Sequence, residues 1–357
     1  MMVRSSVILG TVLGFALSVN ASPTAYSSKR GNKLSVQGHR GGLGYRPEST
    51  LWAFANALEL GVDALEMDTV FTKDGISVVW HDHQILATKC RDTVPGAQYV
   101  GKYIANLTLA EVQSLDCGSQ QIDLHPQAEL HPGAKIPTLE EVLDLVDCYG
   151  DKRVEINLET KLDPVRPNET LAIGNYINDI VPILQKRGYA SRTYIQSFDW
   201  RTLVGIKKKF PKTRTVALLD TNNVKSEDRG VSGYPWLGGV DLDGFKGDWV
   251  AAANSIGVTI VSPIHGSPSN ATPNTPGYVP ITTADVVKRA HKLGIQVIPW
   301  TVDFEVTINK MISDGVDGII SNYPERVLHI SEQRGKKSGI KTNRRKPECL
   351  KLASNSV

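Results

Sequence analysis

The sequence predicts an α/β protein with the architecture of a TIM (β/α)8 barrel. Eight short β-rich segments alternate with segments of helical period, which is typical of repeated β/α units. The predicted strands are almost continuously apolar, as in parallel sheets covered on both faces. Without an insertion over 83–136, residues 34–333 amount to 246 positions, close to the roughly 250 of this barrel.

Each strand is expected where an apolar run is bounded by turn residues. The eight predicted strands are Leu34–His39, Ala64–Thr69, Arg153–Glu159, Thr193–Ser197, Thr213–Leu219, Val258–Ser262, Ile295–Trp300 and Gly318–Ser321. The clearest helical periods cover Ser49–Leu60, Leu139–Val146, Thr170–Gln185, Trp200–Lys209, Ala284–Leu293 and Phe304–Ile312. This regular alternation of strands and helices favours a closed parallel barrel over a sandwich.

One extended run does not fit the alternation. Ile76–His81 follows the second strand after only Lys73-Asp74-Gly75, whereas a parallel neighbour needs a crossover of a dozen or more residues. We therefore expect an antiparallel hairpin with a turn at Asp74-Gly75. The insertion over 83–136 follows it and is expected to form a small lid over the barrel mouth.

The first residues have the pattern of a secretory signal peptide, which we place at 1–21. Arg4 is followed by a mostly apolar run from Val7 to Val19, and Ala21 supplies the small residue before cleavage. The run is too short to span a bilayer comfortably. The mature protein is therefore expected to be secreted, extracellular or associated with the cell wall, without stable membrane insertion. Glycosylation acceptors at Asn106, Asn168 and Asn270 suit that location.

Four cysteines in an oxidising compartment predict disulfides. Their spacing matches no zinc pattern, and four cysteines allow three pairings. We favour Cys90 with Cys117, because both lie in the insertion, which needs stabilisation of its own.

The C-terminal segment 334–357 is strongly basic. It holds eight Lys or Arg residues against the single Glu348, so the rest of the mature chain is net acidic. We expect a solvated, disordered tail. Nucleic acid is not an expected partner, because the body is acidic and the tail lacks interleaved aromatic residues.

The chemistry of a TIM barrel lies at the carboxyl ends of its strands. Glu66 and Asp68 are two positions apart on one strand, so both side chains point to the same side. Together with Glu159 on the next strand they form an all-oxygen set that suits one divalent cation, Mg²⁺ or Ca²⁺, better than zinc. The other strand ends supply two imidazoles and two fixed positive charges, namely His39, His81, Arg40 and Lys161. This combination suits phosphoryl transfer.

Several motifs resemble the glycerophosphodiester phosphodiesterase family. They are Gly38-His-Arg-Gly-Gly42, Pro47-Glu-Ser-Thr50, Leu65-Glu-Met-Asp68, Thr72-Lys-Asp-Gly75, Val78-Val-Trp-His-Asp82, Asn157-Leu-Glu-Thr-Lys161, Ser197-Phe-Asp199, Trp300-Thr-Val302 and Gly315-Val-Asp-Gly-Ile-Ile-Ser-Asn-Tyr-Pro324. The resemblance covers residues 22–333, and the expected signal peptide and tail lie outside it.

The resemblance implies metal-dependent hydrolysis of glycerophosphodiesters to glycerol 3-phosphate and an alcohol. His39 and His81 would be the acid–base pair and would act through a cyclic phosphate. The sequence does not decide which histidine is the base. Glu66, Asp68 and Glu159 would hold the cation. The expected substrate-binding residues are Arg40, Lys161, Glu48, Phe198 and Trp300, although Trp300 is equally well explained as a core aromatic.

The sequence departs from the family pattern at a few positions. The family often has Asn at the position of Asp303 and Asp at the position of Asn322, so the acid and the amide are exchanged here. Ser49 stands where Asn is common, and the stretch from His83 to Cys90 replaces a usual Arg-Thr-Thr run. These departures concern substrate preference. A phospholipase D-like enzyme acting on lysophospholipid or sphingomyelin, and a non-catalytic binding barrel, are the alternatives. The leaving alcohol and the oligomeric state are left open.

Overall fold

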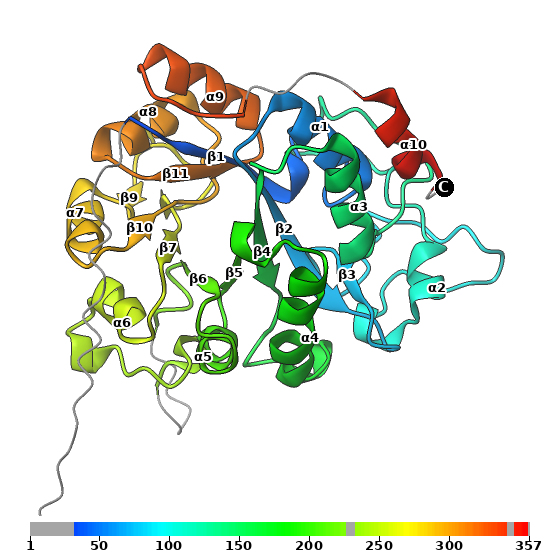
Figure 1. Cartoon of the computed structure of the whole chain (residues 1–357), viewed down its shortest axis with the longest axis horizontal. Coiled ribbons are helices and arrows are strands. Elements are labelled where there is room, and N and C mark those ends of the chain that lie inside the picture. Colours follow the sequence, from blue (N-terminus) through cyan, green and yellow to red (C-terminus); the bar gives the residue numbers. More distant parts are fainter. Residues whose placement is uncertain (1–31, 226–232, 341–345, 356–357) are drawn as a thin grey trace, which may run out of the picture.

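The computed structural model describes residues 32–225, 233–340 and 346–355, and these form an α/β barrel (Figure 1). Its eight parallel strands are β1 (Ser35–Gly38), β2 (Ala64–Phe71), β4 (Glu155–Thr160), β5 (Thr193–Ser197), β6 (Arg214–Leu219), β7 (Ile260–Pro263), β10 (Gln296–Val297) and β11 (Gly318–Ser321). They follow the order β10-β7-β6-β5-β4-β2-β1-β11. All eight predicted strands are confirmed, and so is the fold class.

The two ends of this order meet just beyond the short strand β10. Backbone amides of Asp317 and Ile320 donate to the carbonyls of Val297 and Pro299, and Val302 donates to Ile320. The barrel is therefore nearly closed. Its first and last strands, β1 and β11, lie side by side, with Gly38 paired to Ser321.

Helices cover the outside of the barrel. They are α1 (Leu51–Leu60), α3 (Leu139–Tyr149), α4 (Ile173–Lys186), α5 (Trp200–Lys209), α6 (Trp249–Ser255), α7 (Ala284–Lys292), α8 (Glu305–Asp314) and α9 (Pro324–Gln333). Local signals fix their ends: the Thr50 hydroxyl caps α1, Gly61 ends it with a left-handed φ, and Thr138 and Glu141 form a capping box on α3. Short 3₁₀ turns occur at His39–Gly41, Ile104–Asn106, Pro167–Glu169, Ala190–Arg192, Pro235–Leu237 and Asp243–Phe245. The short strands β8 (Gly266–Ser267) and β9 (Val279–Pro280) pair with each other.

The extended run after β2 is an antiparallel hairpin arm, as predicted. β3 (Ser77–Val79) pairs with Thr69–Phe71 of β2, and Gly75 adopts a φ of 79° in the turn. The insertion packs beside this hairpin and contains helix α2 (Leu109–Gln113) (Figure 1). It has a hydrophobic cluster that includes Trp80, Ile85, Cys90, Leu115 and Cys117.

The C-terminal segment corrects one expectation. Residues 347–355 form helix α10 (Pro347–Asn355), which contacts α1 and α3. Cys349 and Ala353 are fully buried in the main core, and Lys337 pairs with Lys33 beside the start of β1. The prediction of a disordered tail is therefore wrong for residues 334–340 and 346–355. Backbone hydrogen bonds attach Lys337 to Asn32 and Leu34 and attach Ile340 to Gly61, and an apolar face and a disulfide attach α10 to the core. Residues 341–345 and the expected signal peptide lie outside the described residues.

All four cysteines form disulfides. Cys90 is bonded to Cys117, which confirms the expected pairing. Cys148 of α3 is bonded to Cys349 of α10, across 201 residues of sequence.

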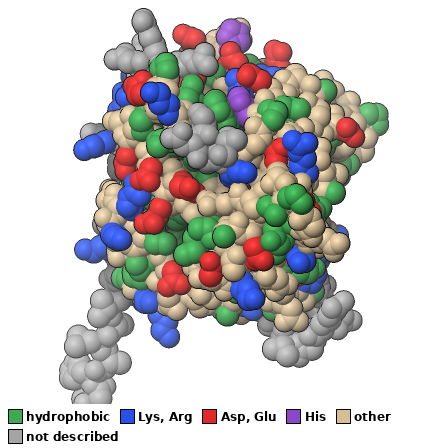
Figure 2. Space-filling view, turned by 90° about the vertical axis from the view of Figure 1, so that its right-hand side faces the viewer, with side chains coloured by type: hydrophobic (Ala, Val, Ile, Leu, Met, Phe, Trp, Pro, Cys, Tyr) green, Lys and Arg blue, Asp and Glu red, His purple; other side chains and the backbone are tan. Residues whose placement is uncertain are grey.

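Acidic and basic side chains are interspersed on the face that carries α2 and α10 (Figure 2). No single-signed block is visible on that face outside the atoms drawn in grey. Among the described residues, no helix is both long enough and apolar enough to cross a bilayer.

Candidate active site

The first residues of the candidate site lie in a tight turn directly after β1. Arg40 adopts a φ of 50° and Gly41 a φ of 83°, so the chain reverses within three residues. A Cβ on Gly41 would lie 2.7 Å from the carbonyl carbon of Ala53. Only glycine permits this approach of the turn to α1. The turn directs the Arg40 amide to Glu66, whose Oε2 accepts it at 2.9 Å.

Three carboxylates converge inside the barrel mouth. The ligand atoms of Glu66, Asp68 and Glu159 lie within 4.8 Å of one another, and all three residues are buried. The pairing of β2 with β4 sets Asp68 directly opposite Glu159. Below them, the Gln196 amide donates to Glu66 Oε1 at 2.7 Å and accepts from Asn157. The structure thus brings together the three carboxylates that were predicted from their places at the strand ends.

The three carboxylates differ in their pKa. Burial raises the pKa of Glu66 well above its ordinary value, and the charges of Asp68 and Glu159 add to that. Burial likewise raises the pKa of Glu159 to about 7, against the opposing charge of Lys161. Asp68 is also buried, but His81, Lys161 and Arg40 outweigh burial and lower its pKa to about 2. Close, buried carboxylates therefore repel one another unless a proton or a cation intervenes.

Two cations flank the carboxylates. The Arg40 guanidinium lies 3.1 Å from Glu48 and 3.5 Å from Asp68, and Lys161 Nζ lies 2.9 Å from Glu159. Both cations are mostly buried, with 15% and 13% of their side chains exposed. Glu48 is buried, and although burial opposes it, the charges of Arg40 and Lys89 lower its pKa to about 2. All three predicted residues are therefore at the site.

The two histidines have different partners. His39 Nδ1 lies 2.5 Å from Asn322 Oδ1, whereas His81 Nδ1 lies 3.0 Å from Asp82 Oδ1. Burial and the charge of Arg40 lower the pKa of His39 to about 3. Burial, Arg40 and Lys161 also lower the pKa of His81 well below its ordinary value.

A cavity of about 370 Å³ opens beside His81. Its walls come from the barrel and from the insertion, and include His81, Asp82, His83, Gln84, Leu86, Tyr103, Glu159, Lys161, Leu162, Asp163, Arg166, Glu169, Phe198 and Trp236. Because the insertion supplies His83, Gln84, Leu86 and Tyr103, it forms a wall of this cavity. Trp300 packs edge-on behind Phe198, with ring centroids 5.3 Å apart.

Sequence reasoning missed several residues at the site. Lys89 contacts Glu48 and Asp82, Asn322 contacts His39, and Tyr103 and Trp236 line the cavity. His125, which comes from the insertion, is buried with its Nδ1 2.9 Å from the Tyr323 hydroxyl. The departures from the family pattern at 83–90 and at 303 and 322 were the only sequence signals for Lys89 and Asn322.

Comparison with known proteins assigns the family. Residues 39–326 match the Glycerophosphoryl diester phosphodiesterase family. The chain belongs to this family. It is 27% identical over 303 residues to the glycerophosphodiester phosphodiesterase of Caldanaerobacter subterraneus subsp. tengcongensis, which covers 85% of this chain and 100% of the relative. Identity to the Bacillus subtilis glycerophosphodiester phosphodiesterase is 29% over 318 residues, covering 87% and 92% of the two chains.

Solved structures of glycerophosphodiester phosphodiesterases share the fold. A Silicibacter pomeroyi protein with the provisional name glycerophosphoryl diester phosphodiesterase is 30% identical, has a TM-score of 0.71 and covers 86% of this chain and 95% of its own. An Oleispira antarctica phosphodiesterase, solved in complex with the product sn-glycerol-3-phosphate, is 21% identical with a TM-score of 0.59, over 84% and 96% of the two chains. The protein is thus a phosphodiesterase of this family.

Proposed function

We propose that the protein hydrolyses glycerophosphodiesters to glycerol 3-phosphate and an alcohol, using one divalent cation and the pair His39 and His81. The observation that carries the proposal is the group of three buried carboxylates, Glu66, Asp68 and Glu159, within 4.8 Å of one another. They lie at the same end of the barrel as both histidines. The glycerol 3-phosphate held by the Oleispira relative supports this substrate class.

The residues fit a hard divalent cation. The donors are carboxylate oxygens only, which suits Mg²⁺ or Ca²⁺. Asp68 Oδ2 is buried and accepts no hydrogen bond from the described residues, with Arg40 Nε 3.5 Å away, so this oxygen has room to accept a further ligand bond. A cation held by Glu66, Asp68 and Glu159 would offset the charge that develops on the phosphate oxygens.

The partners of the two imidazoles support a division of their roles. An amide oxygen at His39 Nδ1 requires a proton on Nδ1, which leaves Nε2 as an acceptor. Neutral His39 is therefore the proposed base, which takes the proton of the glycerol hydroxyl as that oxygen attacks phosphorus. The Asp82 carboxylate at His81 Nδ1 stabilises a protonated ring. His81 is therefore the proposed acid that protonates the leaving alcohol.

In the free protein, burial and the positive charges of Arg40 and Lys161 lower the pKa of His81. The negative charge of a bound phosphodiester would lie near Arg40 and Lys161 and offset their effect, which would favour protonation of His81. A cyclic phosphate forms when the P–O bond to the leaving alcohol breaks. Water then opens the ring, with His81 accepting its proton and His39 returning a proton to the glycerol oxygen.

The cavity beside His81 is the proposed site of the leaving alcohol. It contains charged and polar side chains such as Asp163, Arg166 and Glu169 together with the rings of Tyr103 and Trp236. This lining suits a small polar alcohol better than an acyl chain, which favours the glycerophosphodiesterase over the phospholipase D-like alternative.

We also propose that the protein acts outside the cell. Both disulfides suit an oxidising compartment. The acceptor asparagines Asn106, Asn168 and Asn270 are all exposed. Mass analysis of the secreted protein, before and after removal of N-linked glycans, tests both points.

The first experiment is hydrolysis of glycerophosphocholine by the purified protein, with and without EDTA, followed by phosphorus NMR. We expect glycerol 3-phosphate only when metal is present, and loss of activity in His39→Ala and Glu66→Ala. A diester without a neighbouring hydroxyl should react poorly, and equal rates on it would exclude the cyclic phosphate. Release of a cyclic phosphate from lysophospholipid, with no reaction on glycerophosphocholine, would instead support the phospholipase D-like alternative.

A further inference from the structure

We propose that Lys89, which the insertion contributes, is a positioning residue for this reaction and that the Cys90–Cys117 disulfide holds it in place. Lys89 acts through Asp82 on the ring of His81. The inference rests on the proposed function, because it assigns a device for aligning the proposed acid.

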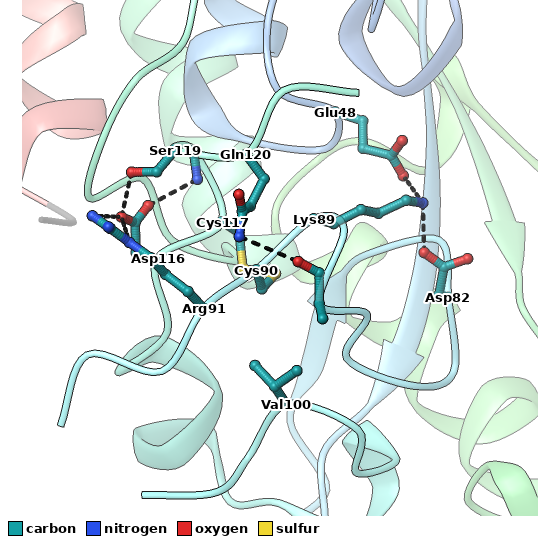
Figure 3. Close-up of a disulfide and its surroundings, with 12 residues drawn as sticks. Glu48, Asp82, Lys89, Cys90, Arg91, Val100, Asp116, Cys117, Ser119 and Gln120 are labelled. Atoms are coloured by element: carbon teal, nitrogen blue, oxygen red, sulfur yellow. Dashed lines mark hydrogen bonds and ion pairs between the residues drawn. A yellow bond between two sulfur atoms is a disulfide. The ribbon is translucent and has the colours of Figure 1, made fainter. Parts of the chain in front are cut away.

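Lys89 connects two carboxylates at the barrel mouth. Its Nζ lies 2.5 Å from Asp82 Oδ2 and 2.8 Å from Glu48 Oε1 (Figure 3). The other oxygen of Asp82 lies 3.0 Å from His81 Nδ1. The ammonium therefore fixes one oxygen of Asp82, and this directs the second oxygen to the imidazole.

The two carboxylates depend on Lys89 to different degrees. Glu48 also has the Arg40 guanidinium at 3.1 Å. For Asp82, Lys89 is the one Lys or Arg ion-pair partner among the described residues. The Asp82 side chain is 20% exposed, so without Lys89 it can turn to solvent and leave His81 without its partner. The effect of losing Lys89 should therefore fall on His81.

Lys89 is placed to orient rather than to bind substrate. It borders a small cavity of about 10 Å³ between the insertion and the Pro47-Glu48 segment. The large cavity is bordered instead by His81 and Asp82. Substitution of Lys89 is thus expected to lower kcat and to change KM little.

The neighbouring residue anchors Lys89 to the insertion. Cys90 is buried in the hydrophobic cluster of the insertion and is bonded to Cys117, which is also buried. On the far side, Arg91 and Asp116 exchange backbone hydrogen bonds and form an ion pair at 2.8 Å. Figure 3 shows Lys89 extending to one side of this disulfide and Arg91 to the other. The cross-link thus fixes the backbone from which the ammonium reaches the site.

The first test compares Lys89→Met with Lys89→Arg and with Lys102→Met on glycerophosphocholine. Lys102 is an exposed lysine of the same insertion and serves as the control. We expect kcat to fall about tenfold to hundredfold in Lys89→Met, part of the 10²–10⁴ that a positioned acid contributes. KM should stay within about threefold, because uniform binding is not lost. Lys89→Arg should recover most of kcat, and Lys102→Met should match the wild type.

The leaving group provides a readout that a general loss of structure would not give. p-Nitrophenolate is stable enough to leave as the anion without taking a proton from His81, so the loss in Lys89→Met should shrink on the p-nitrophenyl diester of glycerol phosphate. An equal loss on both substrates would contradict an action through His81. Equal kcat values for Lys89→Met and the wild type would overturn the inference and leave the proposed function intact, whereas an inactive wild type would remove the proposed function itself.

The second test separates the two disulfides. Cys90→Ala/Cys117→Ala should lower kcat severalfold, because the insertion keeps its hydrophobic cluster but Lys89 loses its anchor. The matched control is Cys148→Ala/Cys349→Ala, which cuts the link between α3 and α10 on the outside of the barrel. It should keep wild-type kcat at temperatures where it stays folded. Unchanged kcat in the first variant would overturn the role of the disulfide.

Discussion

Asn322 Oδ1 lies 2.5 Å from His39 Nδ1, and the amide nitrogen of the same side chain donates to Asp303 Oδ2 at 2.7 Å. Asp303 also accepts the backbone amide of Asn322 and the hydroxyl of Ser321, each at 2.9 Å. The carboxylate thereby decides which way the Asn322 amide faces, and the amide decides which nitrogen of His39 carries the proton.

Asn322→Asp should lower both stability and activity. The new carboxylate would lie against Asp303, and two adjacent acids repel unless one of them takes a proton. We expect a loss of at least about tenfold in kcat and a lower Tm. The double variant Asp303→Asn/Asn322→Asp restores a donor and an acceptor at this contact and should recover much of both. Additive losses in kinetics and thermal unfolding would show that the two positions are not coupled.

The stability of the metal-free protein should depend on Glu159. Its pKa rises from the ordinary 4.5 to about 7 on folding, chiefly through burial. Between these values the unfolded chain releases a proton that the folded chain retains, so this contribution lowers stability as pH rises and is complete above about pH 7. In EDTA, Glu159→Gln should therefore gain on the order of 3 kcal/mol relative to wild type between pH 4.5 and pH 8.

Denaturant titrations at the two pH values measure this difference. Adding Mg²⁺ or Ca²⁺ at pH 8 should stabilise the wild type and have a smaller effect on Glu159→Gln. A constant difference between the two proteins across this pH range would contradict the assignment.

Gly41→Ala should be strongly destabilising. The new Cβ would lie 2.7–2.8 Å from Ala53 and Phe54 atoms, at a φ of 83°. Overpacking and strain together predict a loss of about 3 kcal/mol or more, with reduced activity because the Arg40 amide moves away from Glu66. Gly75→Ala is the control, since its φ is 79° with no atom within 4 Å. The free energy of unfolding of Gly75→Ala should fall by only about 1–2 kcal/mol. Chemical unfolding of the two variants measures the difference.

Removal of the Cys148–Cys349 disulfide should affect stability alone. The cross-link closes a loop of 201 residues, and such links contribute about 2–4 kcal/mol. Cys148→Ala/Cys349→Ala should therefore have a lower Tm and an unchanged kcat at a temperature where it is folded. A drop in kcat there would imply that α10 affects the barrel mouth.

Sequence patterns were sufficient wherever one local rule decided the outcome. The two-residue spacing of Glu66 and Asp68 placed both carboxylates in the mouth, and the short turn at Asp74-Gly75 required a hairpin. The same rules could not show α10, because its position depends on Cys148 far away in the sequence. Lys89 was missed for a similar reason. It lies in an irregular loop, where no periodic pattern in the sequence predicts that its side chain contacts Asp82.

The contact between β1 and β11 relates the active site to the synthesis of the chain. His39 is made early and follows the first strand, while Asn322 follows the last strand, 283 residues later. The three carboxylates, Glu66, Asp68 and Glu159, all lie in the first half of the chain. A nascent chain cannot align His39 until the final strand has joined the first. If His39 is the base that we propose, it has its partner only in a chain that includes the last strand, and we expect chains truncated before Asn322 to be inactive.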